Sequence, residues 1–261
     1  MKITALAIAA VAGVASAQPT FFAFQDDTLF RGGVNGGGVQ SFTLSETIIA
    51  AEFDGSGDLF AHSSPFSPNG SQGYRVDNAF GAAPSLSLSG SGLQNPGPSS
   101  IAFIGNQAFG FNTQGDFVEY DPNTLAEINV IAAQQLGVGG NGLGYDAVND
   151  VLYMVDRNND ALFTVDYTTG DITTVGDLGV DIQNAGATFF DGQLWAAFQN
   201  NSTGNLEVGT IDVNSGALSS AFTLAGFPTG TPATVAFAVI PAPGSIAVLG
   251  LAGLAASRRR R

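Results

Sequence analysis

The 261-residue chain contains no cysteine, which excludes disulfide bonds, thiolate metal sites and cysteine nucleophiles together. Its 22 acidic residues outnumber eight basic ones, and the resulting net charge of −14 argues against a nucleic-acid partner, because such a surface repels phosphate. With 35 glycines, 20 phenylalanines and 44% hydrophobic residues, the composition is typical of closely packed strands joined by tight turns and excludes a disordered chain.

The N-terminus has the organisation of a secretory signal peptide. Lys2 precedes an apolar run that ends at Val14, and the small residues Ala15 and Ala17 form an A-x-A cleavage site before Gln18. We therefore expect a signal peptidase to remove residues 1–17, leaving residues 18–240 as the exported body. That body contains all the acidic residues against three arginines and no lysine, which suits solubility, cation binding or an extracellular setting.

The body is predicted to start with an incomplete unit of strands between Phe21 and Ala50. Its expected strands are residues 27–30, 39–44 and 47–50. Further along, an aspartate that closes a strand recurs at spacings of 44, 45 and 46 residues, as Asp77, Asp121, Asp166 and Asp212. Two segments rich in serine, glycine and proline, Ser63 to Gly73 and Gly90 to Pro98, are expected to be loops.

The clearest unit runs from Val151 to Gly179. Apolar runs at 152–155, 162–165 and 172–175 are separated by polar turn residues, which predicts three antiparallel strands. The stretch resembles the repeat units of bacterial propellers that carry an LY-x-hydrophobic-D phrase followed by L-hydrophobic-T-hydrophobic-D-x-x-T-G. The matching residues are Leu152, Tyr153, Val155, Asp156, Leu162, Thr164, Asp166, Thr169 and Gly170. This resemblance implies a fold and transfers no active site.

A period in the mid-forties with about four strands per unit predicts an all-β fold, a β-propeller. We expect five blades, with innermost strands at 51–53, 100–104, 142–145, 187–190 and 233–240. The last of these would pair with N-terminal strands and close the ring, which removes exposed sheet edges. An open solenoid or a β-sandwich is the alternative.

The C-terminus combines a proline-bracketed tripeptide, a short apolar segment and a basic tail. Pro241, Ala242 and Pro243 form the tripeptide, and Arg258, Arg259, Arg260 and Arg261 form the tail. This order resembles the PEP-CTERM sorting signal, with Ala242 in place of the glutamate. The resemblance implies that residues 241–261 form a hydrophobic sorting helix and a transient membrane anchor, which an exosortase-type transpeptidase cleaves at the motif.

The apolar part of this segment, Ser245 to Ser257, is shorter than the ~20 apolar residues that span a bilayer comfortably. The four arginines would hold the tail on the cytoplasmic side of the membrane. A plain C-terminal membrane anchor is the alternative, and it gives the same topology.

The sole histidine, His62, is expected in a solvent-exposed loop, since no nucleophile elbow accompanies it and one imidazole cannot build a histidine-cluster zinc site. The string Gly137-x-Gly139-x-x-Gly142 matches a dinucleotide fingerprint, but it continues into a strand instead of a helix and is interpreted as a link between blades. We therefore assign no catalytic residue and no cofactor from the sequence.

Two loops place oxygen ligands at alternate positions, as Ca²⁺ sites do. They are Asp54-x-Ser56-x-Asp58 and Asp156-x-Asn158-x-Asp160. Neither is an EF-hand, because position 6 is not glycine and no glutamate follows at position 12. Turn capping by Asp and Asn is the favoured interpretation of both loops, and calcium is the alternative.

Three further groups of residues recur through the units. Aromatic residues at equivalent strand positions are expected to pack between blades, the alternative being an aromatic platform for sugar or peptide: Phe109, Tyr153 and Trp195. The body's three arginines are expected to pair with neighbouring aspartates, with an anionic ligand as the alternative: Arg31, Arg75 and Arg157. The recurring aspartates are expected to accept backbone hydrogen bonds in turns, because a catalytic pair would break the repeat.

The favoured functional hypothesis is an exported, surface-sorted, non-catalytic propeller at the cell surface or in the extracellular matrix, binding a surface polysaccharide or a partner protein. The alternative is a secreted hydrolase or lyase that acts on carbohydrate or lactone through carboxylates at the central channel. A glycosidase pair would stand about 5–10 Å apart at one end of that channel. A third hypothesis is a matrix filler, which needs neither a pocket nor an ion site.

Overall fold

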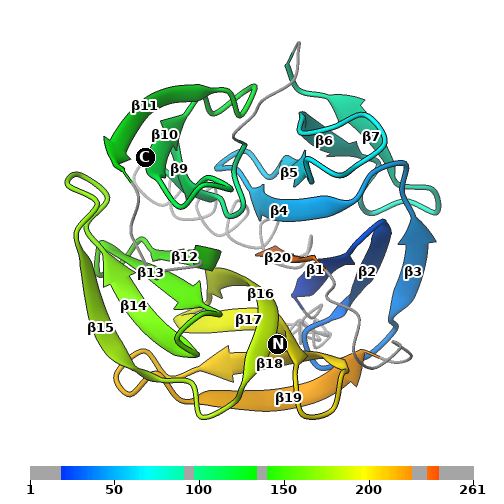
Figure 1. Cartoon of the computed structure of the whole chain (residues 1–261). Helices are drawn as coiled ribbons and strands as arrows, with labels where there is room; N and C mark the ends of the chain where they lie inside the picture. The colour runs from blue at the N-terminus through cyan, green and yellow to red at the C-terminus, as the bar shows by residue number, and fades with distance from the viewer. Residues whose placement is uncertain (1–18, 91–96, 134–139, 225–233, 241–261) are drawn as a thin grey trace, which may run out of the picture. The chain divides into compact units, whose positions relative to one another are not determined.

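The computed structural model describes residues 19–90, 97–133, 140–224 and 234–240. In this part of the chain, the strands form five four-stranded antiparallel sheets, arranged as blades around a central axis (Figure 1). The protein is thus an all-β, five-bladed β-propeller, as the repeat predicts. Its innermost strands lie where the sequence predicts all five of them.

Each blade is named here by its order in the ring, and its strands are given from the axis outward. Blade 1 consists of β20 (Val235–Ile240), β1 (Thr20–Gln25), β2 (Thr28–Gly33) and β3 (Gln40–Thr43). Blade 2 consists of β4 (Ile48–Phe53), β5 (Leu59–Ser63), β6 (Gly73–Asp77) and β7 (Ser85–Leu88). Blade 3 consists of β8 (Ala102–Ile104), β9 (Gln107–Phe111), β10 (Phe117–Tyr120) and β11 (Glu127–Ala132). Blade 4 consists of β12 (Gly140–Asp146), β13 (Val151–Asp156), β14 (Ala161–Val165) and β15 (Ile172–Asp177). Blade 5 consists of β16 (Ile182–Phe190), β17 (Gln193–Asn200), β18 (Leu206–Ile211) and β19 (Leu218–Leu224).

Blade 1 closes the ring by combining both ends of the body. Strand β20 pairs antiparallel with β1, in a register that runs without a shift from Thr20 opposite Ile240 to Gln25 opposite Val235. The predicted closure is therefore confirmed. Because β20 sits at the axis, the last strand of the body supplies the innermost edge of the first blade.

The first unit differs from its prediction at two points. Residues 47–50 do not form an outer strand of blade 1, because Ile48–Phe53 is one continuous strand, β4, at the axis of blade 2. The second strand of blade 1 is instead Thr20–Gln25, which the sequence analysis missed. Its last five residues are all buried, so it lacks the alternation of apolar and polar residues that marks a half-exposed strand.

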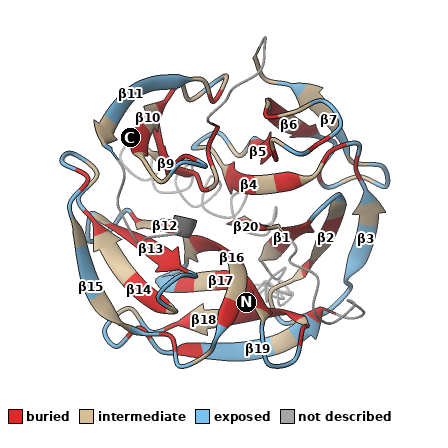
Figure 2. Ribbon diagram, in the orientation of Figure 1, coloured by how far each residue is buried: buried red, intermediate tan, exposed pale blue. Residues whose placement is uncertain are grey.

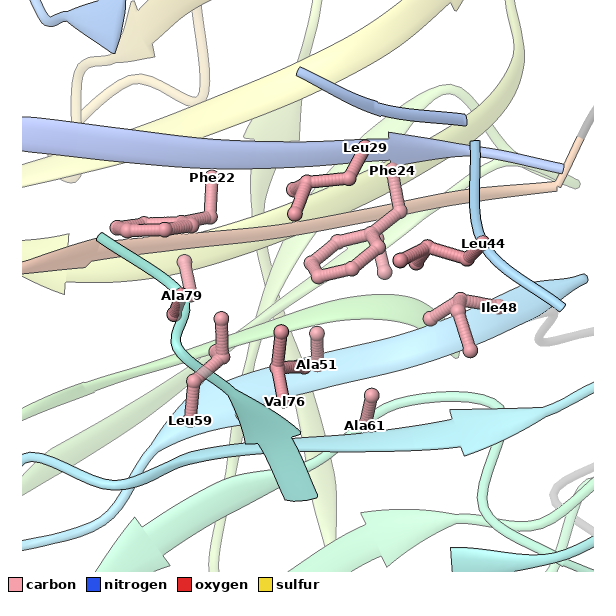
Figure 3. Close-up of a cluster of buried hydrophobic side chains, with 12 residues drawn as sticks. Phe22, Phe24, Leu29, Leu44, Ile48, Ala51, Leu59, Ala61, Val76 and Ala79 are labelled. Atoms are coloured by element: carbon pink, nitrogen blue, oxygen red, sulfur yellow. The ribbon is translucent and has the colours of Figure 1, made fainter. Parts of the chain in front are cut away.

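The hydrophobic core lies in the joints between blades and not in one central mass. Figure 2 shows buried residues on the inner strands and exposed residues along the outer ones. Separate clusters of buried side chains join neighbouring blades. In the joint of blades 1 and 2, Phe22, Phe24 and Leu29 pack on Ile48, Leu59 and Val76 (Figure 3).

The aromatic residues predicted to pack between blades do so. The Tyr153 ring of blade 4 stacks on Phe189 of blade 5, with centroids 6.0 Å apart. Phe109 of blade 3 contacts Tyr167 of blade 4 at 5.6 Å. Trp195 of blade 5 packs on a cluster that includes Phe21 of blade 1. These residues therefore hold the ring together and form no exposed platform.

Both ends of the chain, residues 1–18 and 241–261, lie outside the described residues. The signal-peptide residues Ala15 and Ala17, the sorting motif and the arginine tail therefore remain predictions. Within the described ranges, no helix has the length and hydropathy needed to cross a membrane.

Candidate binding site at the two ends of the central channel

The five inner strands approach one another so closely that the channel narrows to a waist. Most residues that line this waist are alanine, glycine or serine, and the space left there is about 10 Å³, room for about one water molecule. Gly142 and Gly186 permit the approach. A Cβ atom on Gly142 would lie 2.6 Å from the Ala187 nitrogen, and one on Gly186 would lie 2.4 Å from the Phe237 nitrogen. The channel therefore consists of two separate hollows, one at each end.

The hollow at the end where the inner strands begin, called the upper hollow here, has a volume of about 530 Å³. This size is typical of a ligand pocket. Its lining residues are Ile49, Ser64, Pro65, Phe66, Ser99, Phe111, Asn112, Thr113, Gln114, Gly115, Arg157, Asn158, Asn184 and Thr234. Among the described residues, this lining contains amide and hydroxyl side chains, one guanidinium and two phenylalanines, and no carboxylate.

Hydrogen bonds fix the loop that carries the amides of blade 3. The Oδ1 atom of the buried Asn112 accepts hydrogen bonds from the backbone nitrogens of Gln114 (2.9 Å) and Asp116 (3.0 Å). Its Nδ2 atom donates to the Asp116 carboxylate at 3.0 Å. The loop between β9 and β10 is thus held in place before any ligand arrives.

The three arginines of the body have different roles. The predicted pairing with aspartate is confirmed for Arg75, which contacts Asp58 at 2.8 Å. It is wrong for Arg31, which donates instead to the carbonyls of Ala79 (2.6 Å) and Gly81 (2.8 Å) and so ties blade 1 to blade 2. Arg157 is exposed and lines the upper hollow, and among the described residues its guanidinium forms no ion pair.

His62 is not in an exposed loop, contrary to the prediction. It lies in β5 and is 0% exposed. The segment after β5 folds back over this strand, since the Ser63 hydroxyl donates to the Gly70 carbonyl at 2.6 Å. The backbone of Gly97 also covers the imidazole so closely that a Cβ there would lie 2.1 Å from its Cε1 atom. Burial of this kind favours a structural role for His62.

The loops proposed for calcium use their carboxylates in turns. Asp54 Oδ1 accepts from the backbone nitrogens of Ser56 (3.0 Å) and Asp58 (2.8 Å). Asp156 Oδ1 accepts from the Asn158 nitrogen at 3.2 Å. Asp160 Oδ1 accepts from the nitrogen of Ile182 in blade 5, at 2.8 Å. Among the described residues, no group of three or more histidine, aspartate or glutamate side chains is placed to hold a metal ion.

The recurring aspartates cap turns, as predicted, in three units. The Oδ1 atoms of Asp121, Asp166 and Asp212 accept from the backbone nitrogen two residues further on, at 2.8–2.9 Å. These bonds, together with the Thr168 hydroxyl at Asp166, lower the pKa of all three carboxyls. Asp77 ends β6, where a turn with a different sequence follows.

The last residues of the glycine-rich link, from Gly140, belong to β12, so the link continues into a strand as predicted.

The hollow at the opposite end of the channel, called the lower hollow, has a volume of about 160 Å³. Its lining residues are Glu52, Phe53, Ala102, Phe103, Tyr145, Thr188, Phe189 and Val239. Glu52 is only 8% exposed, and its Oε1 atom accepts from the Phe53 nitrogen at 2.8 Å. Burial raises the pKa of Glu52 to about 8, although the bonds from Phe53 and Thr188 act in the opposite direction.

The sequence analysis missed Glu52 and most of the upper hollow. Glu52 had a usable signal, because it is a lone carboxyl in the otherwise apolar run IIAAEF that forms an inner strand. The amides of the upper hollow had none, since asparagine and glutamine occur in most turns of this chain.

Replacing Glu52 by glutamine is expected to stabilise the protein at neutral pH. The folded state keeps the Glu52 proton up to about pH 8, whereas the unfolded chain releases it near 4.5. Wild-type stability therefore falls between these values as the pH rises, by at most about 1.4 kcal/mol per pH unit. Urea unfolding at several pH values should show the advantage of E52Q growing over this interval and reaching roughly 3 kcal/mol at pH 7.

The matched control is E127Q, which removes a carboxylate from the exposed strand β11. A stability difference between E52Q and the wild type that stays constant with pH would contradict the assignment of a raised pKa.

Comparison with known proteins gives the fold and no site. No family model matches the chain, and no curated protein is similar to it. Among solved structures, it is similar to a chain in the crystal structure of a nidogen/laminin complex, with a TM-score of 0.56 and 12% identity over 85% of this chain and 98% of that one. It is also similar to TolB from Acinetobacter baumannii, with a TM-score of 0.48 and 14% identity over 78% of this chain and 52% of TolB. The first likeness is one of fold alone.

Proposed function

We propose that this protein is an exported, surface-sorted, non-catalytic binding protein, which holds a surface polysaccharide in the upper hollow. The observation that carries this proposal is the chemistry of that hollow. Amide and hydroxyl groups from several blades surround a space of about 530 Å³. Groups of this kind exchange hydrogen bonds with sugar hydroxyls, both as donors and as acceptors.

Two further residues suit a sugar chain. Phe66 is 95% exposed at the rim, where its ring offers an apolar surface on which the CH face of a sugar can pack. Arg157 offers a guanidinium to a carboxylate or sulfate substituent. A partner protein is the other occupant that the hollow admits, and the solved structure reported above is itself a complex of two proteins.

The positions of the carboxylates support a binding role over hydrolysis. The described lining of the upper hollow has no carboxylate, and that of the lower hollow has Glu52 alone. A glycosidase of the usual kind needs two carboxyl groups on either side of the scissile bond. The alternative, a secreted hydrolase or lyase, thus lacks support from these two linings.

Variants of the upper hollow should lose binding. In affinity electrophoresis with extracellular polysaccharide from the producing cells, we expect R157A and F66A each to weaken retention at least ten-fold, as central aromatic and arginine contacts do at interfaces. V148A removes a side chain that is 92% exposed on the turn between β12 and β13, away from this hollow, and should bind like the wild type. Equal retention of all three variants would contradict the proposed site.

Export and sorting are tested by the intact mass of the protein recovered from its native cell surface or medium. We expect a mass that lacks residues 1–17 and the segment after about Pro243. A strain in which Arg258 to Arg261 are deleted should leave the C-terminal segment uncleaved. A native mass that retains the arginine tail would overturn the sorting proposal and leave a membrane-anchored propeller.

A further inference from the structure

The polar side chains that line the upper hollow fall into two groups, and the first group is already bonded inside the protein. The Thr234 hydroxyl donates to the Ile48 carbonyl at 2.8 Å, and Asn184 Oδ1 accepts from the Ala185 nitrogen at 3.1 Å. Both polar atoms of the Asn112 amide bind residues of its own loop. These groups therefore shape the hollow.

The second group consists of a hydroxyl, two amides and a guanidinium. They belong to Thr113, Gln114, Asn158 and Arg157, all exposed lining residues of the hollow. Among the described residues, none of these four side chains forms a hydrogen bond or an ion pair. Residues 113–114 lie on the turn between β9 and β10, and residues 157–158 on the turn between β13 and β14. The groups that are free to bind a ligand thus gather on the neighbouring blades 3 and 4 (Figure 1).

Phe66 adds an apolar surface beside these groups. It belongs to the segment between β5 and β6 of blade 2, and its ring is almost fully exposed. Blades 2, 3 and 4 follow one another around the axis (Figure 1), so the phenyl ring, the amides and the guanidinium lie in this order along one side of the hollow. This order suits an extended ligand such as an oligosaccharide, which can contact three blades at once.

The turn that carries Arg157 is fixed, and the carboxylates on either side of it are used inside the protein. The buried Asp156 accepts from the Asn158 nitrogen at 3.2 Å and from Asn159 Nδ2 at 2.5 Å. Asp160 accepts from the Ile182 nitrogen at 2.8 Å. The guanidinium therefore stays unpaired on a turn that is in place before a ligand arrives, which lowers the entropic cost of binding.

The waist closes the floor of the upper hollow. Ile49 lines both spaces, and Ser99, Asn184 and Thr234 each stand one or two positions before a residue of the waist. A space of about 10 Å³ admits no sugar, so a polysaccharide cannot thread the channel. A chain that crossed the hollow would have to pass over the loops of blades on both sides, whereas a chain end needs only one way in.

Charge also favours an end over a long stretch of acidic chain. The body holds the 22 acidic residues against three arginines, so it repels an anionic polymer laid along its surface. Arg75 pairs with Asp58, and Arg31 binds backbone carbonyls. Among the described residues, Arg157 is thus the one guanidinium left for a ligand, in a lining without carboxylates. An end placed here brings few charges near the acidic body.

Building on the proposed polysaccharide-binding function, we propose that the upper hollow binds the end of an acidic polysaccharide, with a sugar carboxylate on Arg157 and the CH face of a sugar on Phe66. A guanidinium and a carboxylate are both planar and pair through two parallel hydrogen bonds. The free amides of Gln114 and Asn158 can both donate to and accept from sugar hydroxyls. The volume of about 530 Å³ holds a short oligosaccharide and not a long chain.

The first experiment compares two forms of the extracellular polysaccharide from the producing cells, in affinity electrophoresis of the full chain. One form is native, and in the other the carboxylates are chemically reduced to primary alcohols. We expect R157Q to weaken retention by the native form at least ten-fold and retention by the reduced form less than about two-fold. F66A should weaken retention by both forms equally, because stacking on a sugar face does not need the charge.

The matched control is R75Q. It removes the same charge, and Arg75 lines neither hollow, so retention should equal that of the wild type. The second experiment adds free polysaccharide as a competitor, either intact or shortened by partial hydrolysis. At equal mass, competition should rise in proportion to the number of chain ends.

Each outcome tests a separate part of the proposal. Equal effects of R157Q on the native and the reduced form would overturn recognition of a carboxylate. Equal competition by intact and shortened chains would overturn recognition of an end. In both cases, retention that depends on Phe66 would leave the proposed function standing. A wild-type chain that neither form retains would overturn the proposed function as well.

Discussion

A chain that ends at Thr234 is expected to lose cooperative unfolding, whereas a chain that ends at Ile240 is expected to keep it. The difference between the two is β20 alone, which forms the axial edge of blade 1 and pairs with β1 over six residues. Its residues Val235 to Val239 are at most 5% exposed. Each large apolar side chain buried in this way contributes about 1.5–3 kcal/mol, so the strand as a whole is comparable to the roughly 5–15 kcal/mol that stabilise a typical domain.

Thermal unfolding followed by circular dichroism distinguishes the two truncated chains. The longer one should show a single transition close to that of the full chain, because every strand of the propeller is retained. The shorter one should show no sharp transition and should aggregate, since β1 then presents an unpaired apolar edge. A shorter chain that still unfolds cooperatively near the wild-type midpoint would show that ring closure contributes little to stability.

Replacing Gly186 by alanine is expected to destabilise the propeller by about 3 kcal/mol, at the upper end of the effect of overpacking. Gly186 lies on β16 at the joint with β20, and its added Cβ would meet backbone atoms of Ala236 at 2.6 Å and of Phe237 at 2.4 Å. Backbone in the middle of a strand ladder cannot turn aside as a side chain does. One of the two inner strands would therefore have to move away from the axis.

The control for this substitution is G55A. Nothing lies within 4 Å of a Cβ at Gly55, and that residue is exposed on the turn between β4 and β5. Urea unfolding should place G55A within about 0.5 kcal/mol of the wild type. If G186A were as stable as G55A, the channel waist would be looser than the strand positions indicate.

The order of the strands could be predicted because it depends on local sequence, whereas the closure of the ring followed by elimination. Asp121, Asp166 and Asp212 cap similar turns with bonds to residues two positions away, so each of these three units carries the signal by itself. The run at 233–240 had no partner strands of its own beside it in the sequence. Because a closed ring needs a complete last blade, the N-terminal strands were the remaining partners for this run.

The boundary between blades 1 and 2 could not be predicted in the same way. Leu44 and Ile48 are both buried and stand only four residues apart, so no loop signal separates the outer strand of one blade from the inner strand of the next. The burial of His62 also depends on a residue that is distant in the sequence, because the backbone of Gly97 covers its imidazole. The pattern of polar and apolar residues around His62 does not show that a residue far along the chain will bury it.

The sequence by itself determined an acidic, cysteine-free body of repeated four-stranded units that closes through its two ends, because strand periodicity and turn capping act between residues close in the chain. Only the tertiary structure decided which side chains form a site. Asn112, Arg157 and Asn184 meet at one end of the channel, and Glu52 meets Phe103, Tyr145 and Phe189 at the other. Within each of these two groups, every residue belongs to a different blade. The inner strands bring the residues together because small residues at the waist let five backbones converge on one axis.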